Sequence, residues 1–240
     1  MKDFRKLGIA AIMFMAAATT ASAEDDKVEG SISADIVSQY IWRGQDCGHV
    51  SFQPSLGVEY KGLSLSAWGS IGISEPDDTR EFDITLAYTI GGFNIGITDY
   101  WFDSDSDGNE YSYFKYCNGH GNHVFEFNVG YDFGPVALQW FTNFAGSDGT
   151  TDKGDRAYSS YFEISAPFTL GGLDWGAAVG ISPFETSTYG NGGFAVINAS
   201  LTACKDIKIT DTFSIPVFAQ IATNPNQKAA HFVFGFTLQP

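Results

Sequence analysis

Charged residues alternate with apolar residues in several short segments of the chain, and most of these charged residues are carboxylates. Carboxylates that line a narrow aqueous passage favour cations and repel anions. If these segments surround one lumen, the sequence predicts an acidic wall that tolerates cations. The predicted lining residues are Asp35, Arg43, Glu59, Asp83, Glu126, Asp132 and Glu163.

A filled lumen is the alternative interpretation of the same residues. The carboxylates would then pair with Arg43, Arg80 or Lys115, or accept hydrogen bonds from tyrosine and serine. The chain has 28 acidic and 13 basic residues, so basic partners cannot satisfy every carboxylate. Large inward side chains such as Trp68 and Tyr161 favour a filled lumen, and the sequence leaves both interpretations open.

A second acidic pattern, D-S-D-S-D-G, places carboxylates at Asp103, Asp105 and Asp107. Alternate carboxylates followed by a glycine can wrap Ca²⁺, so calcium is the cofactor that the sequence suggests. However, the twelfth position of such a loop carries Phe114 rather than glutamate, and no flanking helices are expected. A solvated acidic surface loop is the simpler interpretation.

The sequence predicts no enzyme. His120 and His123 follow Cys117 in a polar stretch, but no spaced second pair of metal ligands accompanies them. No Ser-His-acid order stands out either. We therefore expect neither catalysis nor a metal centre at these positions.

The stretch from His123 to Phe144 shows the kind of element that must position the acidic residues. Apolar and polar residues alternate up to Phe133, Gly134-Pro135 interrupts the pattern, and alternation resumes at Val136. A period of two predicts a strand with one apolar and one polar face. Two such strands of about ten residues, joined by a tight turn, form the repeating unit of a transmembrane β-barrel.

The rest of the chain repeats this unit, and its connections are alternately short and long. Short turns on one side, long polar loops on the other and an even number of strands predict an all-β fold. Its architecture is an antiparallel up-and-down transmembrane barrel of about 12 strands, with short periplasmic turns and longer extracellular loops. The tight turns are expected at 61–62, 91–92, 134–135, 171–172 and 205–206, and the long loops at 44–51, 74–80, 103–122, 146–156, 182–193 and 223–230. The predicted strands cover 31–43, 52–60, 63–73, 81–90, 93–102, 123–133, 136–144, 158–168, 173–181, 194–203, 207–222 and 231–238.

The predicted outward face carries no charge in its middle, as a lipid-facing wall requires, because a Lys or Arg there would cost about 2–4 kcal/mol. Tyr40 and Trp42 are among the aromatic residues near strand ends that predict an interfacial girdle. Asp99 falls on this outward face, which predicts a bulge near Thr98 or the end of the membrane band.

The three cysteines are too few for a disulfide scaffold. Cys47 and Cys117 fall in predicted extracellular loops, whereas Cys204 falls in a predicted periplasmic turn. Cys47–Cys117 is therefore the disulfide that the predicted topology allows.

The beginning of the chain predicts export. Basic residues within the first six positions precede an apolar core over 7–18 and a small-residue cleavage site that ends at Ala23. We expect residues 1–23 to be a cleaved signal peptide, because the apolar core is shorter than the roughly 20 residues of a membrane anchor. Residues 24–240 are then the barrel domain, located in the bacterial outer membrane.

The formal net charge of −15 argues against a nucleic-acid partner. The expected partners are outer-membrane lipid and small hydrophilic solutes. The sequence predicts no oligomeric state.

Over residues 31–102 the chain resembles a family of uncharacterised bacterial exported proteins. The family pattern opens with S-x-Y-x-x-R-G, continues with G-x-W-x-S and is followed by an acidic strand. The resemblance implies an outer-membrane barrel and transfers no substrate. The matching positions are Val37-Ser-Gln-Tyr40, Trp42-Arg43-Gly44, Gln53-Pro54, Trp68-Gly-Ser70, Glu81-Phe-Asp83 and Tyr88.

Together these features predict a passive channel for small hydrophilic solutes, cationic or neutral, through an acidic lumen. The alternative is a non-conducting barrel that has a structural role or binds a surface partner through its extracellular loops.

Overall fold

The computed structural model describes residues 27–75, 78, 80–104, 112–116, 122–211 and 213–240. The predicted signal peptide, Asp105, Asp107, Cys117 and His120 lie outside these residues.

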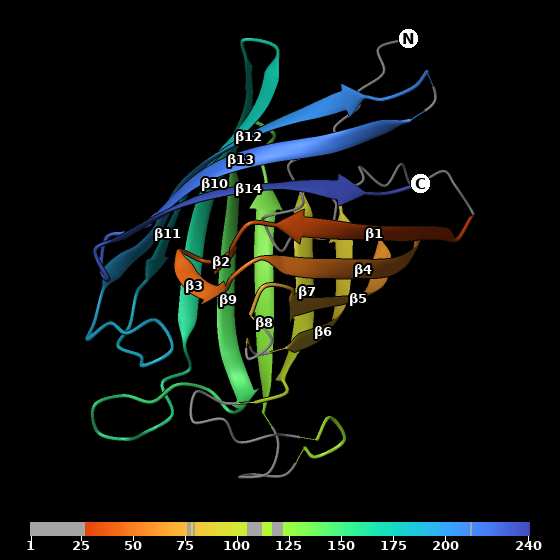
Figure 1. Cartoon of the computed structure of the whole chain (residues 1–240). Coiled ribbons are helices and arrows are strands. Elements are labelled where there is room, and N and C mark those ends of the chain that lie inside the picture. The colour runs from red at the N-terminus through yellow and green to blue at the C-terminus, as the bar shows by residue number, and fades with distance from the viewer. Residues whose placement is uncertain (1–26, 76–77, 79, 105–111, 117–121, 212) are drawn as a thin grey trace.

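The described chain folds into a closed barrel of twelve antiparallel strands, and a separate two-stranded sheet lies apart from the wall (Figure 1). Each wall strand pairs with its sequence neighbours, and β1 closes the barrel against β14. The all-β, up-and-down barrel predicted from the alternating pattern is therefore confirmed. The wall strands are β1 (Glu29–Val37), β4 (Ser51–Tyr60), β5 (Leu63–Gly72), β6 (Glu81–Ile90), β7 (Phe93–Phe102), β8 (His123–Asp132), β9 (Ala137–Gly146), β10 (Ser160–Leu170), β11 (Leu173–Ser182), β12 (Ala195–Lys208), β13 (Ser214–Asn224) and β14 (Ala229–Leu238).

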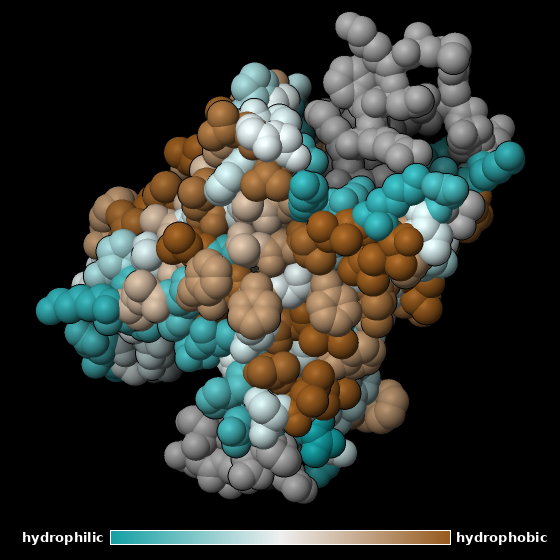
Figure 2. Space-filling model, turned by 45° about the horizontal axis from the view of Figure 1, so that its top comes forward, coloured by the Kyte–Doolittle hydropathy of each residue, from teal (hydrophilic) through white to brown (hydrophobic). Residues whose placement is uncertain are grey.

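The outer surface of the barrel is apolar. Along the wall strands, the outward-facing side chains are largely aliphatic or aromatic, and they are well exposed. Figure 2 shows hydrophobic residues, in brown, gathered over the middle of one face. A soluble protein rarely exposes a continuous apolar surface of this extent. Examples that are 39–62% exposed are Ile32, Leu56, Leu65, Leu86, Ile97, Ile164, Val179, Leu201, Ile221 and Phe234.

The connections follow the predicted asymmetry with two exceptions. Strand β12 continues to Lys208, so the turn to β13 lies at residues 209–213 rather than 205–206. Cys204 is consequently a buried strand residue and not a turn residue, because the alternating pattern continues through it. The connection from β13 to β14 spans only residues 225–228, shorter than the long loop predicted at 223–230.

The largest departure from prediction concerns the first strand. The sequence predicts one strand over 31–43, but β1 ends at Val37, and the chain then forms β2 (Tyr40–Trp42) and β3 (Gln45–Gly48). Arg43 and Gly44 connect β2 to β3 with positive φ angles of 50° and 76°. Positive φ at both central residues is the geometry of a tight two-residue hairpin turn. The chain therefore reverses within the predicted strand, and β2 and β3 pair only with each other.

The closure between the first and last strands is short. In the described chain, β1 pairs with β14 over four residue pairs, from Ala34 to Val37, whereas β1 pairs with β4 over nine. Additional bonds extend this β1–β14 seam: the Ser38 amide donates to the Phe234 carbonyl at 2.9 Å, and the Thr237 hydroxyl donates to Asp35 at 2.6 Å.

Candidate functional site

The hairpin formed by residues 39–49, which we call the internal hairpin, places β2 and its turn inside the barrel, whereas Asp46 and Cys47 of β3 and the side chain of His49 are exposed. Its residues contact inward side chains of one part of the wall: Tyr40 bonds to Glu81 of β6, and Arg43 bonds to Glu126 of β8. At the turn, a Cβ on Gly44 would lie 2.2 Å from the backbone oxygen of Ile197 on β12. The internal hairpin thus crosses the lumen. The prediction that Tyr40 and Trp42 belong to an outer aromatic girdle is wrong.

Arg43 forms the central contact of the internal hairpin. Its guanidinium donates to both carboxylate oxygens of Glu126 at 2.6 and 2.9 Å and to the Tyr189 hydroxyl at 2.7 Å. Glu126 also accepts a hydrogen bond from the Tyr100 hydroxyl at 2.8 Å. Only 6% of the Arg43 side chain and 3% of the Glu126 side chain are exposed, so the ion pair is shielded from solvent.

Aromatic rings enclose this ion pair. The Arg43 guanidinium lies 4.2–4.5 Å from the ring centres of Trp42, Phe141 and Tyr161, which is within the range of cation–π attraction. The Trp42 ring in turn stacks on Tyr189 with centroids 6.0 Å apart. Large rings and an ion pair therefore fill the lumen at this level.

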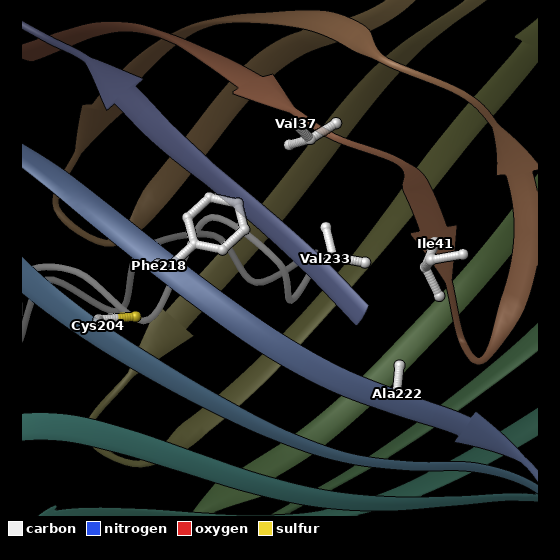
Figure 3. Close-up of a cluster of buried hydrophobic side chains, with 6 residues drawn as sticks. All are labelled: Val37, Ile41, Cys204, Phe218, Ala222 and Val233. Atoms are coloured by element: carbon white, nitrogen blue, oxygen red, sulfur yellow. The ribbon is translucent and has the colours of Figure 1, made fainter. Parts of the chain in front are cut away.

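One side of the internal hairpin packs against an apolar part of the inner wall (Figure 3). Ile41 points into a buried cluster built from β1, β12, β13 and β14. This cluster lies across the β1–β14 seam, so the hairpin and the closure of the barrel share one set of contacts. Its members are Val37, Ile41, Cys204, Phe218, Ala222 and Val233.

The other side of the internal hairpin faces acidic residues of β6. Tyr40 donates its hydroxyl proton to Glu81 at 2.9 Å, and its ring lies 5.6 Å from that of Trp68. Asp83 follows Glu81 on the same inward face and is 1% exposed. Neither carboxylate oxygen of Asp83 has a hydrogen-bond partner among the described residues.

The residues predicted to line a pore occupy several environments. Glu126 and Arg43 pair with each other, as the filled-lumen alternative requires. Glu163 accepts a hydrogen bond from Tyr161, a large inward residue that is itself 1% exposed. Asp132 lies at the exposed end of β8 and accepts from the Gly134 amide at 2.6 Å.

The remaining lining predictions are two inward positions near the β1–β4 pair. Asp35 is buried against Thr237, and Glu59 lies opposite Glu29 near the short-turn end. The predicted lining set is therefore distributed over the lumen instead of forming one ring.

Asp99 lies on the outer face, as the alternation of inward and outward side chains along its strand predicts. The pairing of β7 with its neighbours shows no register shift at Thr98, and the nearby bulge instead lies between Phe125 and Glu126. Asp99 contacts the His123 ring at 2.8 Å, and His123 is only 3% exposed because Tyr113 and Tyr116 cover it. A polar pair on the outer wall is thus shielded by a loop that folds over it.

The predicted calcium ligands are only partly described. Asp103 accepts from the Arg80 amide at 3.0 Å and forms an ion pair with the Arg80 side chain at 3.2 Å. In the parts of the chain that the structure describes, no group of three or more His, Cys, Asp or Glu residues could hold a metal ion. Calcium binding stays a prediction, since Asp105 and Asp107 are not described.

Cys47 is a free thiol in the structure. Its predicted partner Cys117 lies outside the described residues, so the disulfide also stays a prediction.

His49 and Asp78 connect two loops at the long-loop end of the barrel. The His49 amide donates to Asp78 at 2.9 Å, and the His49 ring lies 3.1 Å from the other carboxylate oxygen. This hydrogen bond, and then the negative charge of Asp78, raise the pKa of His49 above its ordinary value of 6.5.

Several residues that enclose Arg43 were not identified from the sequence, namely Tyr100, Phe141 and Tyr189. Glycine provides one signal that could have located the filled level of the lumen. A Cβ on Gly180 of β11 would lie 2.0 Å from the Tyr161 hydroxyl, so only glycine leaves room for this ring.

Among the described residues, no helix is long and apolar enough to cross a membrane. No protein-family model matches the chain, and no curated protein matches it.

Solved structures with a similar arrangement are outer-membrane proteins at low similarity. Salmonella typhi OmpF in complex with daunomycin is 11% identical, with a TM-score of 0.37, over 90% of this chain and 98% of that chain. CdiB from Acinetobacter baumannii is 10% identical, with a TM-score of 0.40, over 89% of this chain, and the match spans only 60% of CdiB. OmpTΔL8, a loop-deletion mutant of a Vibrio cholerae outer membrane protein, is 10% identical, with a TM-score of 0.36, over 90% of this chain and 100% of that chain.

The closed strand order and the apolar outer surface define the class of the molecule independently of these matches. The chain has the fold of a transmembrane β-barrel, and its lumen contains an internal hairpin.

Proposed function

We propose that the protein is a passive channel of the bacterial outer membrane for small hydrophilic solutes, and that the internal hairpin closes it in the state described here. The observation that carries this proposal is the Arg43–Glu126 pair, which holds the hairpin across the lumen. The favoured solutes are cationic or neutral.

The apolar outer surface supports residence in a membrane. Strands of about ten residues suit a bilayer when they are tilted, and closure of the barrel pairs the strand edges that a bilayer cannot hydrogen-bond, with the β1–β14 seam as the shortest pairing. The predicted signal peptide and the alternation of short turns and long loops support the outer membrane as the location.

The chemistry of the inner wall supports cations as the favoured solutes. Glu81, Asp83 and Glu126 face the lumen on β6 and β8, and the described base that contacts this group is Arg43. Arg43 belongs to the internal hairpin. When the hairpin leaves the lumen, this base leaves as well, and the exposed wall becomes more acidic.

Conductance in planar lipid bilayers tests the proposal. We expect the reconstituted protein to open rarely, and a variant in which a short Gly-Ser linker replaces residues 39–49 to conduct steadily with cation preference. Adding Glu126→Gln to the linker variant should reduce that preference, because one wall carboxylate is removed. Arg80→Gln is a matched control, since the Arg80–Asp103 pair lies outside the lumen and Arg80 is 63% exposed.

A linker variant that retains its β-sheet circular dichroism but stays electrically silent would refute the channel. The second candidate function, a non-conducting barrel that binds a partner through its loops, would then be favoured. Contacts between the long loops support that candidate: the Thr150 and Ser187 backbones are hydrogen-bonded, and Ser159 bonds to Thr186 and Thr188.

A further inference from the structure

We infer that residues 39–43 have a second docking position in the wall of the barrel, along an edge of β14 that is unpaired in the described state. In that position the segment extends β1, and the internal hairpin becomes part of the wall. The inference rests on the proposed function, because it specifies the movement that opens the channel, but its test does not require conduction.

The first argument is the free edge of β14. Just beyond the last β1–β14 pair, the Ser38 amide donates to the Phe234 carbonyl, so the backbone of Phe234 faces the seam. Backbone groups of every second residue point to the same side of a strand, so those of Phe232 and Ala230 face the seam as well. Among the described residues they have no backbone partner on that side. Phe232 is 64% exposed on the apolar outer surface, where an unpaired edge is unfavourable and a partner strand is favoured.

The second argument is the register of the β1–β14 ladder. This ladder ends at Val37. If the same register continues, residues 39–43 lie opposite residues 233–229, and Tyr40 lies opposite Phe232. The segment and the free edge therefore match in length, and no shift of β1 is needed to pair them.

The third argument is a break that occurs at the same level in both arms of the hairpin. Residues 38–39 separate β1 from β2, and residues 49–50 separate β3 from β4. Val37 lies opposite Ser51, and the β2–β3 pairing resumes three residues further along each arm, so the two breaks face each other. The internal hairpin is therefore the tip of one long hairpin that bends inward at a paired hinge.

The fourth argument is the alternation within the segment. In the second position Tyr40 and Trp42 face outward, whereas Ile41 and Arg43 face the lumen. Tyrosine and tryptophan are enriched where a barrel meets the membrane interface. Ile41 already belongs to the buried cluster that contains Val233 of β14 (Figure 3), so it is close to this edge in the described state. Both faces of the segment thus suit the wall.

The two positions exclude each other. The Arg43–Glu126 ion pair and the Tyr40–Glu81 hydrogen bond hold the segment in the lumen. In the second position Arg43 lies opposite Ala229, at the extracellular end of β14, and no longer extends into the lumen to Glu126. Removing the Arg43 side chain therefore shifts the segment toward β14.

Disulfide formation in a variant that carries Tyr40→Cys and Phe232→Cys tests the inference, with the three native cysteines replaced by alanine. In the described state the Tyr40 side chain bonds to Glu81 in the lumen and Phe232 is exposed outside, so the two positions are separated by the wall. In the second position they are directly opposite, at a Cα separation that a disulfide can span. We expect Arg43→Ala to accelerate crosslinking at least about tenfold, because breaking a buried ion pair from one side shifts the balance by more than that factor.

Two control pairs accompany this variant. Asp35→Cys with Thr237→Cys lie opposite each other in the observed ladder and should crosslink at the same rate with and without Arg43→Ala. Tyr40→Cys with Phe236→Cys should crosslink little, because Phe236 lies on the same face of β14 but is already opposite Ile36. Peptide mass spectrometry of the detergent-solubilised protein identifies each disulfide.

A folded Tyr40→Cys/Phe232→Cys protein whose crosslinking is not accelerated by Arg43→Ala would overturn the inference, as would equal crosslinking of the Phe236 control. If the first pair does not fold, Trp42→Cys with Ala230→Cys provides the same test in the same register. Crosslinking in a protein that stays silent in bilayers would refute only the channel. A conducting linker variant without crosslinking in the cysteine pairs would refute only the second docking position.

Discussion

Arg43→Ala is the most informative substitution, because it removes one partner of the buried ion pair and leaves the other. Glu126 would retain the Tyr100 hydrogen bond at 2.8 Å but lose two charge-assisted bonds at 2.6 and 2.9 Å. Breaking a buried pair from one side typically costs about 3–5 kcal/mol. We expect the free energy of unfolding to fall by an amount in this range. The lost cation–π contacts to Trp42, Phe141 and Tyr161 contribute to this decrease.

Denaturant unfolding in detergent, with refolding checked for reversibility, measures this loss. A double variant, Arg43→Met with Glu126→Gln, should recover part of the stability, because no uncompensated charge is then buried. Arg80→Ala is the matched control: its ion pair with Asp103 is exposed, and such pairs contribute at most about 1 kcal/mol.

The proposed opening moves the internal hairpin out of the lumen without unfolding the wall, so bilayer conductance of Arg43→Ala is measured in parallel. The reasoning is refuted if Arg43→Ala lies within about 1 kcal/mol of the wild type and its conductance is also unchanged. That result would show that the pair contributes little to holding the hairpin.

Three further predictions follow from the hairpin and its neighbours. Gly44→Ala should displace the hairpin turn and raise conductance in bilayers, because its Cβ would lie 2.2 Å from the Ile197 oxygen at a φ of 76°; unchanged conductance would contradict this placement. Ile41→Ala should lower the unfolding free energy by about 2 kcal/mol or more in denaturant titrations, since it removes buried apolar contacts, and a neutral effect would contradict that packing. Asp78→Asn should lower the pKa of His49 toward 6.5 in an NMR titration, and a pKa that does not fall would argue against the contact. Since pairing raises the His49 pKa, its stabilising contribution should be complete below pH 6.5 and lost as the pH rises through the raised pKa.

The wall of the barrel could be predicted from the sequence because its determinants are local. Alternation with a period of two defines each strand and its outward face, and turn residues such as Gly91-Gly92 define the hairpins. The same alternation predicts that Asp99 lies on the outer face, and the structure places it there.

The filling of the lumen could not be predicted in the same way. The segment from Tyr40 to Trp42 continues the alternation of β1, so nothing in its period separates an internal hairpin from the end of a wall strand. The structure of this segment is decided by partners far away in the chain, Glu126 and Tyr189, which the pattern of residues 31–43 does not contain.

The predicted end of β12, at residue 203, is wrong for a related reason. Cys204 to Asp206 resembles a polar turn, but the turn lies at residues 209–213, because the paired strand β13 continues the ladder to Lys208. Cross-strand pairing therefore overrides the local turn signal.

The short β1–β14 seam has a consequence for the order of assembly. It joins residues about two hundred positions apart, and such distant pairings form late because they require the closure of the longest loop. The internal hairpin follows β1 directly, and Ile41 belongs to the buried cluster that also contains Val37 of β1 and Val233 of β14, on the two sides of that seam. The neighbouring strand pairs can form without the hairpin, whereas its apolar contacts are complete only when the two ends of the chain have met. The last step of folding thus both closes the cylinder and completes the apolar packing of the hairpin, so an immature barrel with an open seam would hold its hairpin through polar contacts with β6 and β8 and without the apolar cluster.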